Sequence, residues 1–389
     1  MSVALDTLVA RAQELYEDLD LKAVRAWKQS TGGKAIGHMP IYVPRELIHA
    51  AGMLPVGIMG GGDRLEIIRG DAYFQSYICH IPRSTIELAL SGRLDALDGM
   101  LFPSICDVIR NLSGMWTMLF PGRYVRYLDV PQNFDPAIGG RFYRQELDRM
   151  RADFAQIAGR ESDDEALRAS IAVYNQQRRA LRELYAARSR QPWFFPISEM
   201  YPVLRAGNLL PPDEHTAMIE EYQRLAVEES GRREQDYSRV VLVGMFCEQP
   251  PLGLLVSLER AGCWIVDDDL LLGLRWILGD VAEDGDPMEN LVRAYLEQSA
   301  ATASRYQPEG DRGRSLIESV RDHNAEGVIF CAPSFCDPAL LEQPMLVAAL
   351  DRAAIPHTQF KYSEDTGQFA VIREQAGTFS DSIRLWSEA

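Results

Sequence analysis

The residues with the most distinctive chemistry in this sequence are six cysteines: Cys79, Cys106, Cys247, Cys263, Cys331 and Cys336. Their thiolates are ligands for soft metal ions and for iron–sulfur clusters. No two of them form a C-x-x-C pair, and no close Cys/His pair has zinc-finger spacing. Zinc is therefore less favoured than an iron–sulfur cluster.

Cysteines follow two of the predicted strands closely. Cys106 lies just past a short apolar strand predicted at 99–103, and Cys336 lies past one predicted at 327–331, which ends at Cys331. In open α/β sheets ligands bind outside the carboxyl ends of the strands. We therefore expect these thiols at a ligand-binding edge.

Two further cysteines have suitable positions. Cys247 follows a predicted strand at 239–246, and Cys79 precedes a predicted helix, whose N–H groups and dipole favour a thiolate. Cys263 lies near the start of its strand and is predicted to belong to the core. Buried free thiols are common in cytosolic proteins, so spacing alone leaves open whether these cysteines form a metal site.

The elements that must position these cysteines alternate between strand and helix at both ends of the chain. An amphipathic helix is predicted at 5–28, and strands are predicted at 35–43, 53–59, 99–103, 123–130, 239–246, 263–266, 327–331 and 358–361. The stretch 141–231 shows only helical patterns. The sequence therefore predicts an α/β protein with two open parallel-sheet, flavodoxin-like domains and a helical segment between them. The predicted limits are 1–140, 141–236 and 237–389.

Composition excludes several classes of function. A formal net charge of −16 over 389 residues argues against nucleic acid or an anionic membrane as a partner. No apolar run is long enough to span a bilayer, and no signal peptide is recognisable, so we expect a cytoplasmic protein whose cysteines are thiols. No G-x-x-x-x-G-K-[ST] loop is present, so ATP hydrolysis by this chain is not expected.

The acidic triplet Asp267-Asp268-Asp269 follows the strand predicted at 263–266. Three carboxylates in a row could hold a divalent cation. A solvated turn that caps the next helix is the favoured interpretation.

Five segments together resemble a known family: residues 39–55, 79–91, 103–107, 266–270 and 335–338. In this order they resemble the 2-hydroxyacyl-CoA dehydratase/benzoyl-CoA reductase family, over about residues 36–389. Within that family, residues 75–79 and 107–116 look most like the C-type subunits of ATP-dependent benzoyl-CoA reductases.

The resemblance implies a cofactor and its ligands. Cys79, Cys106 and Cys336 would hold a [4Fe–4S] cluster with one iron open to water or to a substrate oxygen. A homologous, larger subunit would be the partner, and separate ATP-binding iron–sulfur activator subunits would deliver low-potential electrons. The complex would reduce the aromatic ring of benzoyl-CoA, or act on a related acyl-CoA, in anaerobic aromatic degradation.

Three alternatives stay open beside this expectation. The chain could belong to a radical 2-hydroxyacyl-CoA dehydratase, or it could transfer electrons without touching substrate. Because Cys247, Cys263 and Cys331 are additional cysteines, an [8Fe–9S] double-cubane cluster is the third alternative. The family often has a cysteine after the acidic triplet, where this chain has Leu270-Leu271-Leu272. Candidate proton donors beside the cysteines are His80, Asp107, Glu248 and Asp337.

Overall fold

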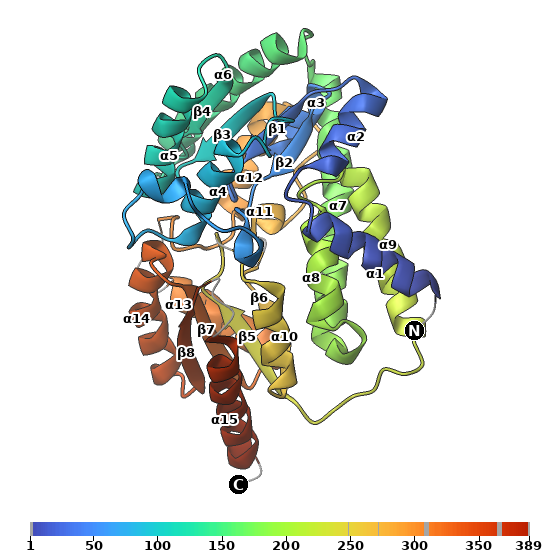
Figure 1. Cartoon of the computed structure of the whole chain (residues 1–389), viewed down its shortest axis with the longest axis vertical. Helices are drawn as coiled ribbons and strands as arrows, with labels where there is room; N and C mark the ends of the chain where they lie inside the picture. The colour runs from blue at the N-terminus through green and yellow to red at the C-terminus, as the bar shows by residue number, and fades with distance from the viewer. Residues whose placement is uncertain (1–2, 248, 271, 307–310, 364–367, 388–389) are drawn as a thin grey trace.

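The computed structural model describes residues 3–247, 249–270, 272–306, 311–363 and 368–387. Figure 1 shows two lobes, each built on one parallel sheet, with long helices running beside both. Glu248 and Leu271, which were singled out in the sequence, lie outside the described residues.

The first lobe contains a four-stranded parallel sheet. Its strands are β1 (Ala35–His38), β2 (Leu54–Gly57), β3 (Gly99–Pro103) and β4 (Tyr124–Leu128), and their order is β2-β1-β3-β4. They alternate with the helices α3 (Arg45–Ala50), α4 (His80–Leu90) and α5 (Asp107–Leu119). Every residue of β1, β2 and β3 is buried, which explains why their sequences are mostly apolar, with only His38 polar, and do not alternate.

The second lobe repeats this arrangement. Its strands are β5 (Ser238–Val243), β6 (Cys263–Asp268), β7 (Gly327–Pro333) and β8 (His357–Tyr362), in the order β6-β5-β7-β8. The accompanying helices are α10 (Leu252–Arg260), α13 (Asp311–Asp322), α14 (Asp337–Arg352) and α15 (Phe369–Ser387). Both sheets have the strand order 2-1-3-4, so the predicted α/β class with two flavodoxin-like sheets is confirmed.

The predicted helical stretch forms a layer that contacts both lobes. It contains α6 (Arg141–Ala158), α7 (Asp164–Arg190), α8 (Ile197–Ala206) and α9 (Pro212–Glu228), and α1 (Val3–Tyr16) packs on α8 and α9. The long helix α7 touches α3 in the first lobe and β6 in the second (Figure 1). None of the helices in the described ranges is long and apolar enough to cross a membrane.

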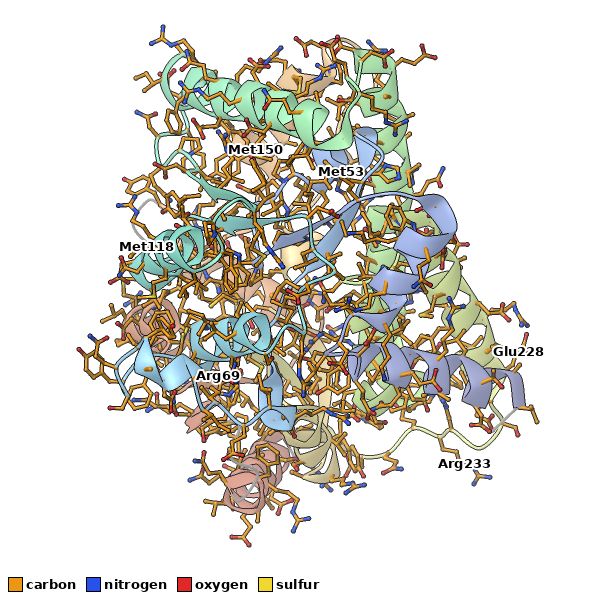
Figure 2. The ribbon with its side chains drawn as sticks, turned by 45° about the horizontal axis from the view of Figure 1, so that its top comes forward. Met53, Arg69, Met118, Met150, Glu228 and Arg233 are labelled. Atoms are coloured by element: carbon orange, nitrogen blue, oxygen red, sulfur yellow. The ribbon has the colours of Figure 1, made fainter. Side chains whose placement is uncertain are left out.

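Helix faces separate buried from exposed side chains in the expected way. Met150 on α6 is fully buried on the side of the first sheet, whereas Met118 near the end of α5 is 83% exposed (Figure 2). The apolar faces of these helices therefore complete the core of the first lobe.

The amino-terminal region differs from the prediction of one helix. Two helices form, α1 and α2 (Lys22–Thr31), because the Asp18 carboxylate accepts hydrogen bonds from the backbone N–H groups of Lys22 and Ala23 at 2.9 Å each. Leu21 between them has a left-handed backbone with φ 52°. A side chain that caps the start of α2 thus interrupts the continuous helical pattern.

Several strand limits also differ, and two of these differences concern residues near the cysteines. β1 ends at His38 instead of residue 43, because Ile41 and Tyr42 adopt φ values of 70° and 62°, which no strand tolerates. β7 continues to Pro333, so Cys331 lies inside the strand and not at its end.

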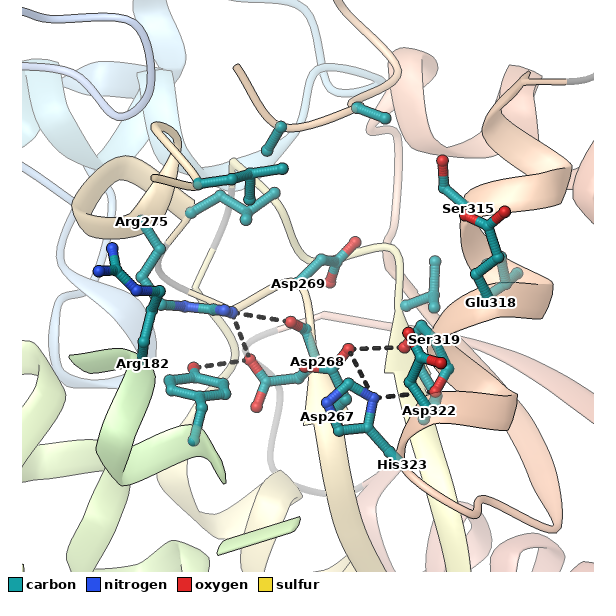
Figure 3. Close-up of a pocket in the computed structure, with 18 of the residues that line it drawn as sticks. Arg182, Asp267, Asp268, Asp269, Arg275, Ser315, Glu318, Ser319, Asp322 and His323 are labelled. Atoms are coloured by element: carbon teal, nitrogen blue, oxygen red, sulfur yellow. Dashed lines mark hydrogen bonds and ion pairs between the residues drawn. The ribbon is translucent and has the colours of Figure 1, made fainter. Parts of the chain in front are cut away.

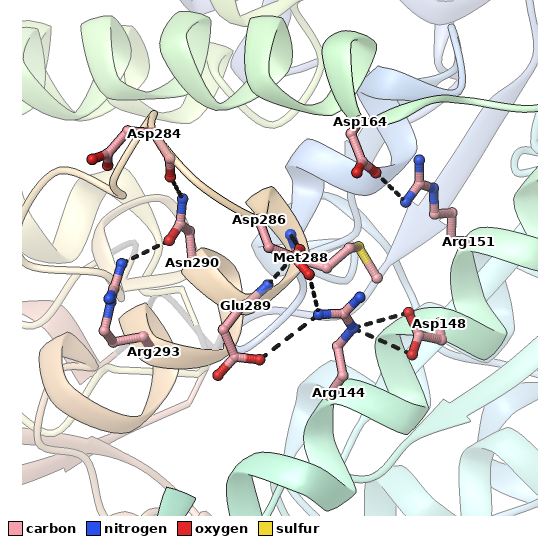
Figure 4. A network of polar contacts seen from close by, with 10 residues as sticks. All are labelled: Arg144, Asp148, Arg151, Asp164, Asp284, Asp286, Met288, Glu289, Asn290 and Arg293. Atoms are coloured by element: carbon pink, nitrogen blue, oxygen red, sulfur yellow. Dashed lines mark hydrogen bonds and ion pairs between the residues drawn. The ribbon is translucent and has the colours of Figure 1, made fainter.

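After β6 the chain returns to the first lobe. There α12 (Pro287–Gln298) packs on α6 and α7, and α11 (Leu272–Arg275) precedes it. Arg144 of α6 forms an ion pair at 2.8 Å with Asp286, the residue that caps α12 (Figure 4). The buried Tyr295 of α12 donates a hydrogen bond to the carbonyl of Pro131 at 2.8 Å. The domain limits 1–140, 141–236 and 237–389 stay a prediction.

Candidate metal centre

Two predicted site cysteines occupy equivalent places in the two lobes. Cys106 is the N-cap of α5, three residues after β3, and Cys336 is the N-cap of α14, three residues after β7. Both strands adjoin the point where the strand order of their sheet reverses, at β1/β3 and at β5/β7. Ligand crevices of open α/β sheets form at that point.

A short repeat in the sequence marks these two positions, and the sequence analysis missed it. Pro-Ser-x-Cys-Asp occurs at 103–107 and again at 333–337. Each copy ends a central strand and begins a helix, so one local structure supplies one thiol from each lobe. Comparing the two halves of the chain would have found the pair without a family resemblance.

Cys79 and Cys247 lie at the same place. Cys79 is the N-cap of α4, and Cys247 follows β5 by four residues. Together with Cys106 and Cys336 they line one pocket between the lobes, whose remaining wall is mostly apolar: Met39, Pro40, Ile78, Ile81, Ile105, Val108, Ile109, Phe335 and Pro338, with Asp107 and Asp337. The structure thus brings together the three predicted ligands and one further thiol.

The walls of this pocket contain strained backbone. Phe335, which precedes Cys336, has φ 66°, and the left-handed Ile41 and Tyr42 directly follow Met39 and Pro40 in the wall. The Tyr42 hydroxyl is tied to Ser304 at 3.0 Å and to the Thr302 hydroxyl. Such conformations persist only where surrounding contacts enforce them, and they concentrate at functional sites.

Cys247 and Cys336 form a coupled pair. Their sulfur atoms are 3.7 Å apart, and both side chains are buried. The thiol of Cys247 as donor lowers the pKa of Cys336 below its ordinary value and raises the pKa of Cys247. The backbone N–H of Ala339, in the first turn of α14, also lowers the pKa of Cys336. The geometry therefore favours a thiolate at Cys336.

The pKa of Cys106 is shifted in the opposite direction to that of Cys336. Burial raises the pKa of its thiol to about 11, and the backbone N–H groups of Ile109 and Val108 oppose that rise. A metal cation bound at this position would lower the pKa of the thiol, since thiols that coordinate a metal are deprotonated.

The arrangement does not suit a single metal ion. Within the described residues, no group of three or more His, Cys, Asp or Glu side chains is placed to hold one ion. A four-iron cluster differs, because it takes one cysteine thiolate at each iron and its ligands surround a larger body. Three thiols in an apolar wall, each at the N-terminus of a helix, fit that donor chemistry.

The other predicted residues separate into two groups. Asp107 and Asp337 line the pocket as the first residues of α5 and α14, and His80 begins α4. Cys331 and Cys263 are fully buried in β7 and β6 and do not line it. The prediction that Cys331 ends its strand is therefore wrong, whereas Cys247 does reach the pocket.

The acidic triplet is not a solvated turn. Asp267 and Asp268 belong to β6, and the Asp268 carboxylate is an ion-pair partner of the buried Arg188 at 2.7 Å. It also accepts a hydrogen bond from the Tyr185 hydroxyl at 2.9 Å (Figure 3). The favoured interpretation of the triplet is thus wrong, because tertiary partners draw these carboxylates into the core.

Asp269 holds the segment that leads to Cys247. Its carboxylate accepts the backbone N–H groups of Gly244 at 2.8 Å and Met245 at 3.0 Å. Burial raises the pKa of Asp269 to about 6 despite these hydrogen bonds. A carboxylate one strand away therefore fixes the start of the loop that carries the fourth thiol.

A larger cavity of about 1010 Å³ lies next to the triplet, between α7, α11 and α13. Asp267, Asp268 and Asp269 line it together with Arg275 and Ser319 (Figure 3). It shares no residue with the wall of the cysteine pocket. This cavity is thus separate from the thiols.

Residues 40–383 match the family of the 2-hydroxyglutaryl-CoA dehydratase D-component. The chain is 55% identical over 382 residues to the benzoyl-CoA reductase C subunit of Thauera aromatica, covering 98% of this chain and 99% of that protein. It is 30% identical over 386 residues to the beta subunit of (R)-2-hydroxyglutaryl-CoA dehydratase of Acidaminococcus fermentans, covering 98% and 100%. It is 28% identical over 362 residues to the (R)-phenyllactyl-CoA dehydratase beta subunit of Clostridium sporogenes, covering 93% and 95%.

Proposed function

Because this chain belongs to the family of the 2-hydroxyglutaryl-CoA dehydratase D-component, we propose that it is an iron–sulfur subunit of an ATP-dependent benzoyl-CoA reductase. The observation that carries the proposal is the meeting of Cys79, Cys106 and Cys336 at one pocket. The 55% identity to the C subunit of a benzoyl-CoA reductase favours a reductase over other members. The complex would reduce the ring of benzoyl-CoA to a cyclic dienoyl-CoA in anaerobic aromatic degradation.

The proposed cofactor is a [4Fe–4S] cluster held by these three cysteines. When bound, it would supply the low-potential electron that no amino-acid side chain can provide. The chain's own contribution is the environment. Apolar neighbours such as Ile81, Ile105 and Ile109 exclude water, and the first turns of α5 and α14 direct backbone N–H groups at the sulfurs of Cys106 and Cys336.

A double-cubane [8Fe–9S] cluster is the weaker alternative. It would use six thiolates, three for each half. Four cysteines line the pocket, whereas Cys263 and Cys331 are buried in strands away from it. We therefore favour the single cluster.

The partners follow from the same proposal. A homologous, larger subunit would hold a second cluster, and ATP-binding iron–sulfur activator subunits would deliver electrons. This agrees with the relatives, which are themselves subunits of larger enzymes. We propose a cytoplasmic location, where the six cysteines stay reduced. Asp107 and Asp337 are the proton-donor candidates that reach the pocket wall, while His80 begins a helix beside it.

A second candidate function is a subunit of a radical 2-hydroxyacyl-CoA dehydratase. It is favoured by the 30% identity to a dehydratase beta subunit over nearly the whole chain. The two candidates use the same thiols and differ in substrate. Anaerobic assays of the complete complex with benzoyl-CoA and with a 2-hydroxyacyl-CoA, both with reductant and ATP, distinguish them.

The iron site is tested by variants of the complex purified without oxygen. Cys79→Ala, Cys106→Ala and Cys336→Ala are each expected to lose the iron bound to this chain, measured as iron and sulfide per complex. Cys263→Ala, which removes a buried thiol away from the pocket, is the matched control and should keep the wild-type iron content. Full iron retention in the three folded variants would refute the assignment.

A further inference from the structure

We propose that Phe335 shields the cysteine pocket from solvent. Its ring would cover the pocket on the solvent side and keep water and small reactants away from the thiols of Cys79, Cys106 and Cys336. It would protect a cluster held by these thiols in the same way. The part of this inference that concerns the cluster rests on the proposed function, whereas the part that concerns the thiols does not.

The position of Phe335 at the boundary between pocket and solvent is the first argument. Its side chain lines the pocket together with the thiols, yet 50% of it is exposed. Cys336, the next residue, is only 2% exposed. No other large apolar side chain in the described wall of the pocket is exposed to this extent. Phe335 is thus the apolar residue of this wall that lies between the thiols and water.

The backbone of Phe335 is the second argument. The N–H of Cys336 donates a hydrogen bond to the carbonyl of Pro333 at 3.1 Å, so residues 333–336 form a tight turn. Phe335 is the third residue of this turn and has φ 66°. Glycine or asparagine usually occupies a turn position with positive φ, and a bulky side chain there is strained. Strain of this kind persists where the surroundings enforce it, and it concentrates at functional sites.

The first copy of the Pro-Ser-x-Cys-Asp repeat provides an internal comparison, which is the third argument. In both copies the serine donates its backbone N–H to the last residue of the neighbouring strand, Ser104 to β4 at 2.9 Å and Ser334 to β8 at 2.7 Å. Ile105, at the position that corresponds to Phe335, is buried and has no positive φ. The left-handed conformation is therefore not needed to attach the strand end or to place a cysteine at a helix start. It accompanies a side chain that stays at the rim of the pocket instead of entering the core.

A shield at this place has a chemical consequence for a bound cluster. An electron from the activator subunits adds one negative charge, and that charge is less stable in a dry apolar site than in contact with water. Exclusion of water by Phe335 would therefore keep the reduction potential low, as the proposed reaction requires. The same cover would slow the access of oxygen and of chelators to the iron. Phe335 itself makes and breaks no bond.

The first test measures the thiols of the full chain prepared without iron and kept reduced. Phe335→Gly removes the ring and suits the backbone, because glycine adopts a positive φ readily. We expect iodoacetamide to label Cys106 several-fold faster in this variant than in wild type, as measured by mass spectrometry of its peptide. Cys106 belongs to the other lobe, so its labelling reports an opening of the pocket and not flexibility beside residue 335. Cys263, buried in β6, is the internal reference and should keep its rate.

Stability measurements separate shielding from a purely structural role. The urea midpoint of Phe335→Gly should equal or exceed that of wild type, because relief of strain offsets the greater freedom of the unfolded chain. Phe335→Leu keeps an apolar cover and should be labelled at nearly the wild-type rate. Met118→Ala removes an exposed apolar side chain outside the pocket wall and is the matched control. A Phe335→Gly chain with a lower midpoint and faster labelling of Cys263 as well would show general loosening of the fold, and would overturn the inference.

The second test uses the complete complex, purified without oxygen. We expect Phe335→Gly to lose iron to a chelator several-fold faster than wild type, and the reduction potential measured by EPR titration to become more positive. Any iron held by the larger partner contributes equally to both proteins. Equal labelling of Cys106, or equal iron loss and potential, in wild type and Phe335→Gly would overturn the shield and leave the proposed function intact. A wild-type chain that binds no iron would overturn the proposed function, while the labelling of Cys106 would still decide the shield.

Discussion

The Asp269 carboxylate, which accepts hydrogen bonds from the segment before Cys247, should make the stability of the protein depend on pH. Its pKa is raised from the ordinary 3.8 to about 6, first by burial, with the N–H groups of Gly244 and Met245 opposing the rise. The folded state therefore binds the proton more tightly than the unfolded chain. Below about pH 4 both states are protonated, and the group costs no stability. As pH rises through 6, the ionised form becomes a cost of about 3 kcal/mol, from about two pKa units at 1.36 kcal/mol each.

The substitution Asp269→Asn removes this dependence. The amide keeps one acceptor oxygen, so one of the two backbone N–H groups loses its partner at every pH, at about 1–3 kcal/mol. The difference in unfolding free energy between variant and wild type should therefore shift in favour of Asn by about 3 kcal/mol between pH 4 and pH 7. Below pH 4 the variant should be the less stable protein.

The assay is urea denaturation of the chain prepared without iron and kept reduced, followed at several pH values. Glu259, whose pKa is raised to about 7 by burial, is present in both proteins and cancels in the difference. A variant-minus-wild-type difference that stays constant from pH 4 to 7 would refute the reasoning.

Two further predictions concern buried carboxylates. Asp268→Ala leaves the Arg188 guanidinium, 1% exposed, without its partner and should cost about 3–5 kcal/mol of unfolding free energy by urea denaturation. The double variant with Arg188→Met should recover most of that loss, and no recovery would contradict the ion-pair argument. Glu87→Ala removes the acceptor for the backbone N–H groups of residues 68–70 and should cost about 2–4 kcal/mol, with faster proteolysis of that loop. Glu87→Gln, which keeps an acceptor oxygen, should lose less; equal losses would contradict the hydrogen-bond explanation.

Central strands were the elements that the sequence predicted best. The strand at 99–103 has the predicted limits, because an apolar run is enclosed between Asp98 and the Ser104 turn. Helix α3 also begins where local sequence favours a helix start, at Arg45 directly after Pro44. In these places local chemistry and tertiary structure favour the same conformation, so the pattern is sufficient.

The errors arise where distant contacts decide the backbone. Tyr42 is apolar and β-prone, but its hydroxyl is bound by residues about 260 positions later, and its φ becomes positive. The Asp triplet is polar in sequence, yet Arg188 and the Gly244 segment bury two of its carboxylates. These contact partners lie far away in the sequence, so a local residue pattern does not reveal them.

The candidate site was predictable in part for the same reason. Both Cys247 and Cys331 lie at the ends of predicted strands, so the sequence could not tell which of them belongs to the site. A shift of two residues in the end of β7 buries Cys331 in the sheet, whereas Cys247, four residues past β5, has room to turn into the crevice. Predicted strand limits can differ from the observed ones by a few residues, and here such a difference separates a core thiol from a thiol in the pocket wall.

The packing of α12 on the first lobe affects what happens when the chain is cut by a protease. The exposed linker between α9 and β5, near residues 229–235, is the natural place for a protease to cut (Figure 1). A nick there would not release two independent pieces. The carboxyl-terminal fragment would still be anchored by Tyr295 and by Asp286, which is ion-paired with Arg144, in the body of the other fragment. Because each fragment would contribute to the packing of the first lobe, we expect the two fragments to stay associated and to keep the cysteine pocket between the lobes.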